Sequence, residues 1–113
     1  MGLFTRTPRI DAEGAHRLLG DGQAVLLDVR EHHEWSAGHA PGAVHIPLRQ
    51  LPERHRELPD GRRLVVACRS GGRSARAVKF LHGVGVAAEN LEGGMIAWKA
   101  RGLPLQPGNG SIR

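Results

Sequence analysis

The sequence predicts an α/β domain in which a mostly parallel sheet is covered by helices on both faces. Short apolar runs of strand length alternate with segments whose apolar residues recur at helical spacing, and this order is typical of βαβ units. The chain has 113 residues, of which 40% are hydrophobic. That length and composition fit one core, so we expect a single domain over residues 9–105 with flexible termini at 1–8 and 106–113.

The first two elements are a short amphipathic helix and a buried strand. Asp11 is a plausible helix cap, because its side chain can accept a hydrogen bond from the amides of the first turn. Apolar side chains recur at helical spacing over residues 12–19, and Gly20 is expected to end the helix in a left-handed conformation. Residues 24–29, AVLLDV, form an apolar run that is typical of a strand buried on both faces.

The chain between residues 31 and 58 is more polar. Residues 31–38 are too short and polar for a core helix, and a Pro-Gly turn then leads into a brief strand over 43–46. The pattern over residues 48–58 predicts another helix, in which Pro52 is tolerated only near the first turn.

The second half of the chain holds the clearest strand, loop and helix pattern. Residues 64–68, LVVAC, are the most strand-like segment, and a glycine-rich loop follows them directly. Helical spacing resumes over residues 74–85, where glycines can end the helix. A short strand over 88–91 and a helix over 94–100 complete the expected order.

Composition bears on which partners the protein can have. The net charge is +5, and 14 of the 16 basic residues are arginines scattered along the chain. Arginine suits forked recognition of oxyanions, but codon bias and solubility also explain such a surplus. Only 4% of the residues are aromatic, so nucleic-acid binding would rest on charge alone and is not expected.

The sequence contains no recognisable signal for membrane insertion or lipid attachment. No stretch has the length and apolar character of a signal peptide or a membrane span. Gly2 could begin a myristoylation signal, but that signal requires Ser or Thr at the sixth position, where this chain has Arg6. We therefore expect a cytoplasmic protein with no membrane partner.

Cys68 is the one cysteine of the chain, which excludes an intrachain disulfide and a multi-cysteine metal site. It ends the strand 64–68, at the sheet edge where parallel α/β proteins bind ligands. The glycine loop behind it lets backbone amides converge on one point, and the helix start, Arg69 and Arg73 favour a thiolate. A buried inert thiol is the usual state of a lone cysteine, but these neighbours favour a nucleophile.

A cysteine, a glycine-rich loop and an arginine also occur in protein tyrosine phosphatases. Their loop has five residues between Cys and Arg, whereas four, Arg69 to Gly72, separate Cys68 from Arg73. The smaller cradle suits one additional sulfur atom on Cys68 better than a phosphoryl group. An arsenate reductase is also less favoured, because the chain has no second cysteine that could resolve an intermediate.

Three segments resemble those of the single-domain rhodaneses, which are sulfurtransferases. Residues 26–48, LLDVREHHEWSAGHAPGAVHIPL, are similar to the family's N-terminal signature, and residues 65–81, VVACRSGGRSARAVKFL, to its active-site loop and helix. Residues 90–105, NLEGGMIAWKARGLPL, resemble its closing segment. The resemblance implies a three-layer sandwich around a five-stranded parallel sheet. It also implies that Cys68 takes sulfane sulfur from a donor such as thiosulfate, as a persulfide, and passes it to cyanide or a thiol.

The resemblance also assigns roles around Cys68, the nucleophile. The substrate-binding set consists of Arg69, Ser70, Gly71, Gly72, Arg73 and Ser74. Their amides would hydrogen-bond the persulfide, and the two arginines would attract thiosulfate or the departing sulfite. Asp28 and Arg30 end the neighbouring strand and could support the loop. We favour a structural role for both, as a turn cap and as an ion pair between Arg30 and Glu34.

The remaining motifs have simpler explanations. Of the seven histidines, His32, His33 and His39 lie in a polar segment without a Glu or Cys at ligand spacing, so we expect no metal and no cofactor. Trp35 and Trp98 are expected to anchor the core.

Two functional questions stay open at this point. A noncatalytic rhodanese-like binding module is the main alternative to an enzyme, although the intact Cys68 and its loop glycines count against it. The sequence also leaves open whether the physiological acceptor is a small thiol or a sulfur-carrier protein.

Overall fold

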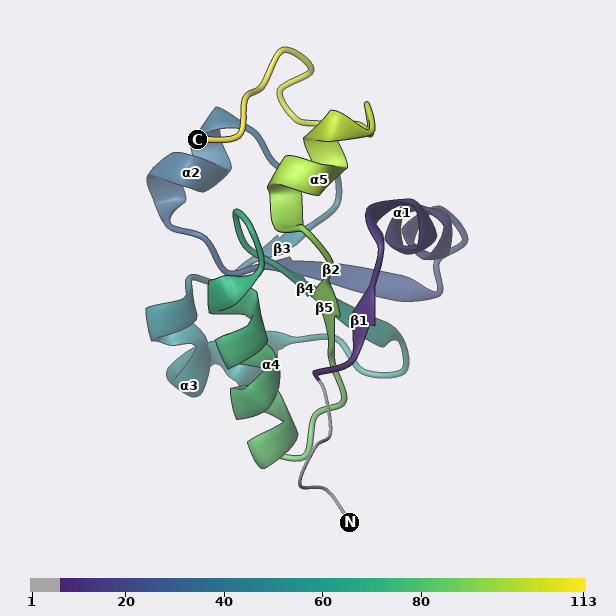
Figure 1. Cartoon of the computed structure of the whole chain (residues 1–113). Coiled ribbons are helices and arrows are strands. Elements are labelled where there is room, and N and C mark those ends of the chain that lie inside the picture. Colours follow the sequence, from purple (N-terminus) through teal and green to yellow (C-terminus); the bar gives the residue numbers. More distant parts are fainter. Residues whose placement is uncertain (1–6) are drawn as a thin grey trace.

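A computed structural model describes residues 7–113 of the chain and shows a sheet between two layers of helices (Figure 1). Most of the predicted N-terminal tail, residues 1–8, therefore lies outside the described residues. The strands are β1 (Arg9–Ile10), β2 (Ala24–Asp28), β3 (Val44–His45), β4 (Arg63–Ala67) and β5 (Glu89–Leu91). The α-helices are α1 (Ala12–Gly20), α2 (His32–Ala37), α3 (Leu51–Arg54), α4 (Gly72–Gly83) and α5 (Gly94–Ala100). Two 3-10 turns, η1 (Leu48–Gln50) and η2 (His55–Glu57), flank α3.

The sheet has five strands in the order β1-β5-β4-β2-β3, and every neighbouring pair is parallel. The central pair is β2 and β4, with a register that runs from Ala24 opposite Arg63 to Asp28 opposite Ala67. Because parallel strands need crossover connections, helices cover both faces of the sheet. The predicted α/β sandwich around a five-stranded parallel sheet is confirmed.

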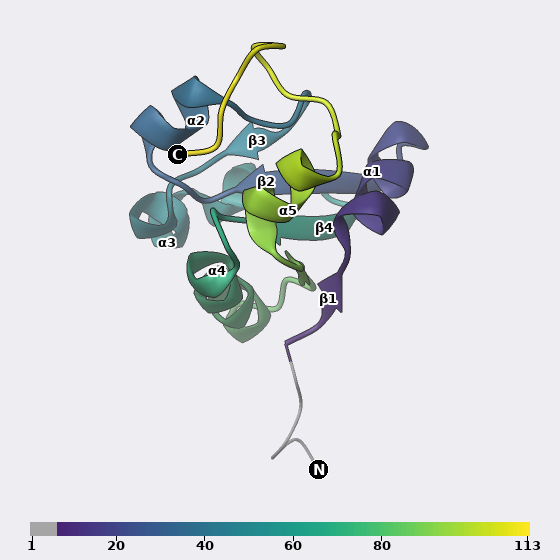
Figure 2. The same cartoon turned by 45° about the horizontal axis from the view of Figure 1, so that its top comes forward.

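Side chains of alternate residues in the two central strands point to opposite faces of the sheet and pack into two separate hydrophobic cores. Leu27 of β2 and Val66 of β4 face α3 and α4, where they pack with Val78 and Leu81. Leu26 of β2 and Val65 of β4 face the other way, toward α1 and α5, where they pack with Met95. Figures 1 and 2 show α3 and α4 on one side of the strands and α5 on the other. All of β2, and β4 from Leu64 onward, are buried because both faces of the strands are covered.

Most of the predicted elements are present, with differences at their ends. The Asp11 side chain caps α1 by accepting from the Gly14 amide at 2.7 Å, as predicted. The prediction for Gly20 was wrong, because Gly20 is the last helical residue and Gly22 takes the left-handed conformation, with φ of 71°. The helix predicted over 48–58 is divided into η1, α3 and η2. Pro52 lies in the first turn of α3, where a proline is tolerated.

The sequence pattern did not predict β1. It has two residues and no apolar run, and its pairing is defined by the backbone: the Asn90 amide donates to the Pro8 carbonyl at 2.7 Å and the Glu92 amide to the Ile10 carbonyl at 2.8 Å. Such an edge strand leaves no periodic signal in the sequence.

The two tryptophans have different environments. Trp98 is 1% exposed, and its indole N–H donates to the Pro104 carbonyl at 2.8 Å, so the prediction of a core anchor is confirmed. For Trp35 that prediction was wrong. Trp35 is half-buried and stacks on His39, with ring centroids 3.7 Å apart, and on His45, at 4.6 Å.

The segment after α5 returns to α2, and the C-terminus lies beside that helix (Figure 2). Gln106 and His39 exchange backbone hydrogen bonds of 2.7 and 3.0 Å, and the Ser111 amide donates to the Ala37 carbonyl at 2.9 Å. Residues that the sequence assigned to a flexible end thus have fixed backbone partners. In the part of the chain that the structure describes, no helix combines the length and apolar character needed to span a membrane.

Candidate active site

The site begins where β4 ends. Cys68 follows the last strand residue, at the carboxyl edge of the sheet, and the chain turns through three loop residues into α4. Gly71 closes this turn with φ of 122°, a conformation that a residue with a side chain rarely adopts. Its amide donates to Cys68 Sγ at 3.0 Å. The glycine is therefore required to aim a backbone N–H at the sulfur.

The Cys68 thiol is 1% exposed, and hydrogen bonds to its sulfur set its pKa. Burial by itself raises the pKa of Cys68, because it disfavours the charged thiolate. The Ser74 hydroxyl, 3.2 Å from Sγ, and the amides of Ser74, Gly71 and Ser70 outweigh that effect and lower the pKa below its ordinary value. The sequence predicted a lowered pKa of Cys68, but it attributed the effect to the helix start together with Arg69 and Arg73. Hydrogen bonds contribute more than any charged neighbour.

Arg73 lies in the first turn of α4, and its guanidinium is directed at Glu34 of α2. Its Nη1 and Nη2 atoms donate to the two Glu34 carboxylate oxygens at 2.7 and 2.8 Å. The hydrogen bond from Arg73 outweighs burial and lowers the pKa of Glu34 to about 2. The Glu34 hydrogen bond raises the pKa of Arg73, and a Cys68 thiolate raises it further. Arg73 is thus close enough to Cys68 to interact with its charge, but its hydrogen bonds go to Glu34.

The other loop residues differ in exposure. Arg69 and Ser70 are exposed, whereas Ser74 is fully buried beneath the loop. Amides in the first turn of α5 donate to the loop from the other side: Met95 N–H donates to the Cys68 carbonyl at 2.9 Å and Ile96 N–H to the Arg69 carbonyl at 3.1 Å. The backbone of the loop is therefore held by β4, α4 and α5 together.

Gly94 makes this approach of α5 possible. It has φ of 60°, and a Cβ at this position would lie 2.5 Å from the Arg69 carbonyl oxygen. That separation is far shorter than a van der Waals contact. The sequence pattern predicted Gly94 to lie in a helix but indicated no role for it, because the close approach depends on two segments that are distant in the chain.

Asp28 and Arg30 form a buried unit beside the loop, and both side chains are 0% exposed. Asp28 accepts from the Arg30 backbone N–H at 3.0 Å, as in the predicted turn cap, and from the Arg30 guanidinium at 2.7 to 3.1 Å. The predicted Arg30–Glu34 ion pair was wrong. Arg30 donates instead to the backbone carbonyls of Glu34 and Gly38, at 3.4 and 2.8 Å. Arg30 thereby fixes α2, which carries Glu34 to Arg73.

Asn90 of β5 is a site residue that the sequence analysis missed. Its side-chain Nδ2 donates to the Gly71 carbonyl at 3.2 Å, and its Oδ1 accepts from the Ser74 hydroxyl at 2.5 Å. A polar residue inside a short strand beside the active-site strand was the available signal. The order of the strands was needed to use it, because β5 neighbours β4 only in the folded sheet.

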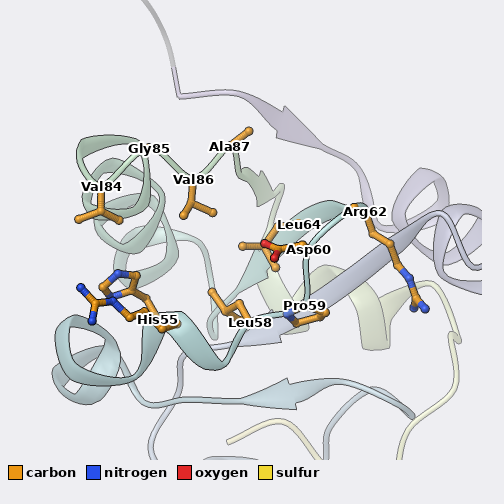
Figure 3. Close-up of a pocket in the computed structure, with 12 residues that line it drawn as sticks. His55, Leu58, Pro59, Asp60, Arg62, Leu64, Val84, Gly85, Val86 and Ala87 are labelled. Atoms are coloured by element: carbon orange, nitrogen blue, oxygen red, sulfur yellow. The ribbon is translucent and has the colours of Figure 1, made fainter.

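The cavity in Figure 3 lies at the amino end of β4, whereas Cys68 follows the carboxyl end of that strand. Leu64 at the amino end of β4 lines it, together with Leu58 before that strand and Val84 to Ala87 after α4. A second cavity lies beside α4, where Arg73, Arg76 and Phe80 form one wall and Leu48 and Pro52 lie on the other.

Comparison with known proteins agrees with this geometry. The rhodanese-like domain family matches residues 11–101. A sulfurtransferase of Allochromatium vinosum is 41% identical over 98 residues, which cover 85% of this chain and 92% of that protein. The HTH-type transcriptional regulator Rv0324 of Mycobacterium tuberculosis is 38% identical over 77% of this chain, which spans only 39% of the regulator. The crystal structure of a rhodanese-related protein from Thermoplasma volcanium superimposes with a TM-score of 0.81 at 32% identity, covering 87% of this chain and 96% of that one.

Proposed function

The chain belongs to the rhodanese-like domain family, and from that membership we propose that it is a sulfurtransferase that carries sulfane sulfur as a persulfide on Cys68. Thiosulfate is the proposed donor, and cyanide or a thiol the proposed acceptor. The physiological acceptor is then a small thiol or a sulfur-carrier protein that reaches the loop from solvent.

The observation that carries this proposal is the set of donors around one sulfur atom. Cys68 Sγ accepts from the Gly71 amide at 3.0 Å and from the Ser74 hydroxyl at 3.2 Å, and both groups favour an anion at this point. The lowered pKa of Cys68 increases the thiolate fraction near neutral pH, and the thiolate is the nucleophilic form. The same converging amides suit the negative charge of a persulfide.

The reaction has two displacement steps at sulfur. In the first, the Cys68 thiolate attacks the outer sulfur of thiosulfate, a new S–S bond forms, and sulfite leaves with the electron pair of the broken S–S bond. In the second, a cyanide or thiolate acceptor attacks the outer sulfur of the persulfide. The Cys68 thiolate leaves with its electron pair, so the enzyme returns unchanged and no external oxidant or reductant is needed.

Phosphate chemistry is less well supported. A phosphatase of this type uses its loop arginine to bind phosphate oxygens. In this protein both terminal nitrogens of Arg73 already donate to the Glu34 carboxylate. The shorter loop also leaves less space for three phosphoryl oxygens. A noncatalytic binding module has no need for the donors that surround Cys68 Sγ.

Mass spectrometry of the intact protein tests the proposal. After incubation with excess thiosulfate and removal of small molecules, we expect the protein to be heavier by one sulfur atom. Cyanide should then restore the original mass and release thiocyanate. The Cys68→Ser variant is the matched control, because it keeps the size of the side chain but not the thiolate, and should gain no mass.

Two outcomes would contradict the proposal. Absence of the adduct at every pH, combined with Cys68-dependent hydrolysis of p-nitrophenyl phosphate, would replace sulfur transfer by phosphatase chemistry. A Cys68→Ser variant that folds normally, by circular dichroism, and still transfers sulfur would remove Cys68 as the nucleophile.

A further inference from the structure

The Ser74 hydroxyl faces more hydrogen-bond acceptors than it has hydrogens. Its oxygen lies 3.2 Å from Cys68 Sγ, 3.2 Å from the Gly71 carbonyl oxygen and 2.5 Å from Asn90 Oδ1. A hydroxyl carries one hydrogen and two lone pairs, so it donates fully to only one of these atoms at a time. The atom that receives the hydrogen therefore decides how Ser74 acts on the Cys68 sulfur.

The orientation of the Asn90 amide makes it a competitor for that hydrogen. Its Nδ2 lies 3.2 Å from the Gly71 carbonyl, and a carbonyl can only accept, so the NH₂ end of the amide faces Gly71. The opposite end, Oδ1, consequently faces Ser74 and can only accept. At 2.5 Å it is the nearest of the three acceptors.

From this arrangement we propose that Asn90 is a positioning residue, which holds the Ser74 hydrogen while Cys68 is a thiol and releases it to the sulfur when Cys68 ionises. The inference rests on the proposed function only in taking Cys68 as the nucleophile. In the thiol state, the Cys68 S–H donates to Ser74 Oγ, and Ser74 donates to Asn90 Oδ1. On ionisation the thiol proton passes to solvent, the Ser74 hydroxyl turns toward Sγ, and Asn90 Oδ1 loses its donor.

Asn90 therefore acts on Cys68 in two opposing ways. Through Gly71 it braces the loop whose amide donates to the thiolate, and this favours ionisation. Through Ser74 it retains a hydrogen that the thiolate needs, and this opposes ionisation. Because only the second route passes through the hydroxyl, removing that hydroxyl separates the two.

The test is a double-mutant cycle on the pH profile of Cys68 alkylation. The rate of modification by iodoacetamide is measured against pH for the wild type, Asn90→Ala, Ser74→Ala and the double variant. Loss of the Asn90–Gly71 hydrogen bond is common to both backgrounds, so the difference between the two shifts reports the part that acts through the Ser74 hydroxyl. Asn90→Ala shifts the midpoint in each background, and the two shifts are compared. We expect the shift with Ser74 present to be more negative than the shift in the Ser74→Ala background, by roughly half a pH unit to one unit.

Asn90→Asp is a second, nearly isosteric variant with the opposite expectation. A carboxylate holds the Ser74 hydrogen more firmly than an amide does, so it should raise the midpoint more when Ser74 is present than in the Ser74→Ala background. The added charge contributes equally to both backgrounds and cancels in the comparison. Asn109→Ala, at an exposed asparagine, is the control and should keep the wild-type midpoint.

Equal shifts in the two backgrounds, or couplings of reversed sign, would overturn the proposal. Asn90→Asp gives this answer even if Asn90→Ala does not fold. Alkylation requires no sulfur transfer, so the two hypotheses fail separately. If the expected coupling is found but no persulfide forms, the proposed function is wrong and the role of Asn90 stands. If a persulfide forms but the coupling is zero, the role of Asn90 is wrong and the proposed function stands.

Discussion

Glu34 and Arg73 are 39 positions apart in the chain, and their side chains form a two-pronged ion pair with N–O distances of 2.7 and 2.8 Å. The pair joins α2 to the first turn of α4, directly behind the Cys68 loop. Glu34 is almost fully buried, whereas Arg73 is one-third exposed. The pair therefore combines an inaccessible carboxylate with an arginine that reaches the edge of the site.

We first predict that this pair makes stability depend on pH under acidic conditions. The pKa of Glu34 is about 2 in the folded protein and has an ordinary value of 4.5. The pair therefore stabilises the fold fully above about pH 4.5, and its contribution is lost as the pH falls toward 2. Urea unfolding of the wild type should show this loss, whereas Glu34→Gln should remove that part of the pH dependence.

At neutral pH, Glu34→Gln should lower the free energy of unfolding by about 1 to 3 kcal/mol, because it leaves a partly buried arginine without its charged partner. Glu31→Gln is the matched control, since Glu31 pairs with Arg49 at 3.3 Å on the exposed surface. Equal acid sensitivity in the wild type and Glu34→Gln would contradict the assignment of the pKa effect to this pair.

The second prediction concerns the hydroxyl at the sulfur. Ser74→Ala removes a donor that lowers the pKa of Cys68, so the midpoint of its alkylation profile should rise by roughly half a pH unit to one unit. Ser70→Ala is the control, because its exposed side chain is removed while its backbone amide stays. A midpoint that rises equally in both variants would mean that the Ser74 hydroxyl has no special role.

The third prediction tests the approach of α5 to the loop. Gly94→Ala adds a Cβ that would lie 2.5 Å from the Arg69 carbonyl oxygen, and it also forces a side chain to adopt positive φ. Gly102→Ala is the matched control, with φ of 69° and no atom within 4 Å of the added Cβ. We expect the control to cost about 1 to 2 kcal/mol, and Gly94→Ala to cost about 1 to 3 kcal/mol more, in urea unfolding. Equal losses would show that α5 moves away without consequence.

The fourth prediction concerns the buried ion pair beside the loop. Arg30→Met should destabilise the protein by about 3 to 5 kcal/mol, because it leaves the Asp28 carboxylate buried without a partner and two backbone carbonyls without a donor. Arg49→Met, at a side chain that is 66% exposed, should change the unfolding midpoint little. Similar midpoints for the two variants would rule out the structural role of Arg30.

The sequence by itself was sufficient to locate every strand except β1 and to place Cys68 at the carboxyl end of β4. Apolar runs such as residues 64–68 reveal buried strands, because a strand covered on both faces has no polar positions. Cys68, its glycine loop and the start of α4 are adjacent in the chain, so the strand–loop–helix unit that brings the Gly71 amide to the sulfur was readable locally. Local sequence encodes local geometry of this kind.

Contacts between distant segments were decided only by the tertiary structure. Glu34 was expected to pair with Arg30, four residues before it, and it pairs with Arg73 instead. Asn90 reaches Ser74 because β5 lies beside β4 in the sheet, and Gly94 meets Arg69 because α5 starts above the loop. Each of these contacts depends on strand order and helix packing. The periodicity of a sequence indicates which residues share one face of a helix or strand. It does not indicate which helices and strands become neighbours, so it could not predict these contacts.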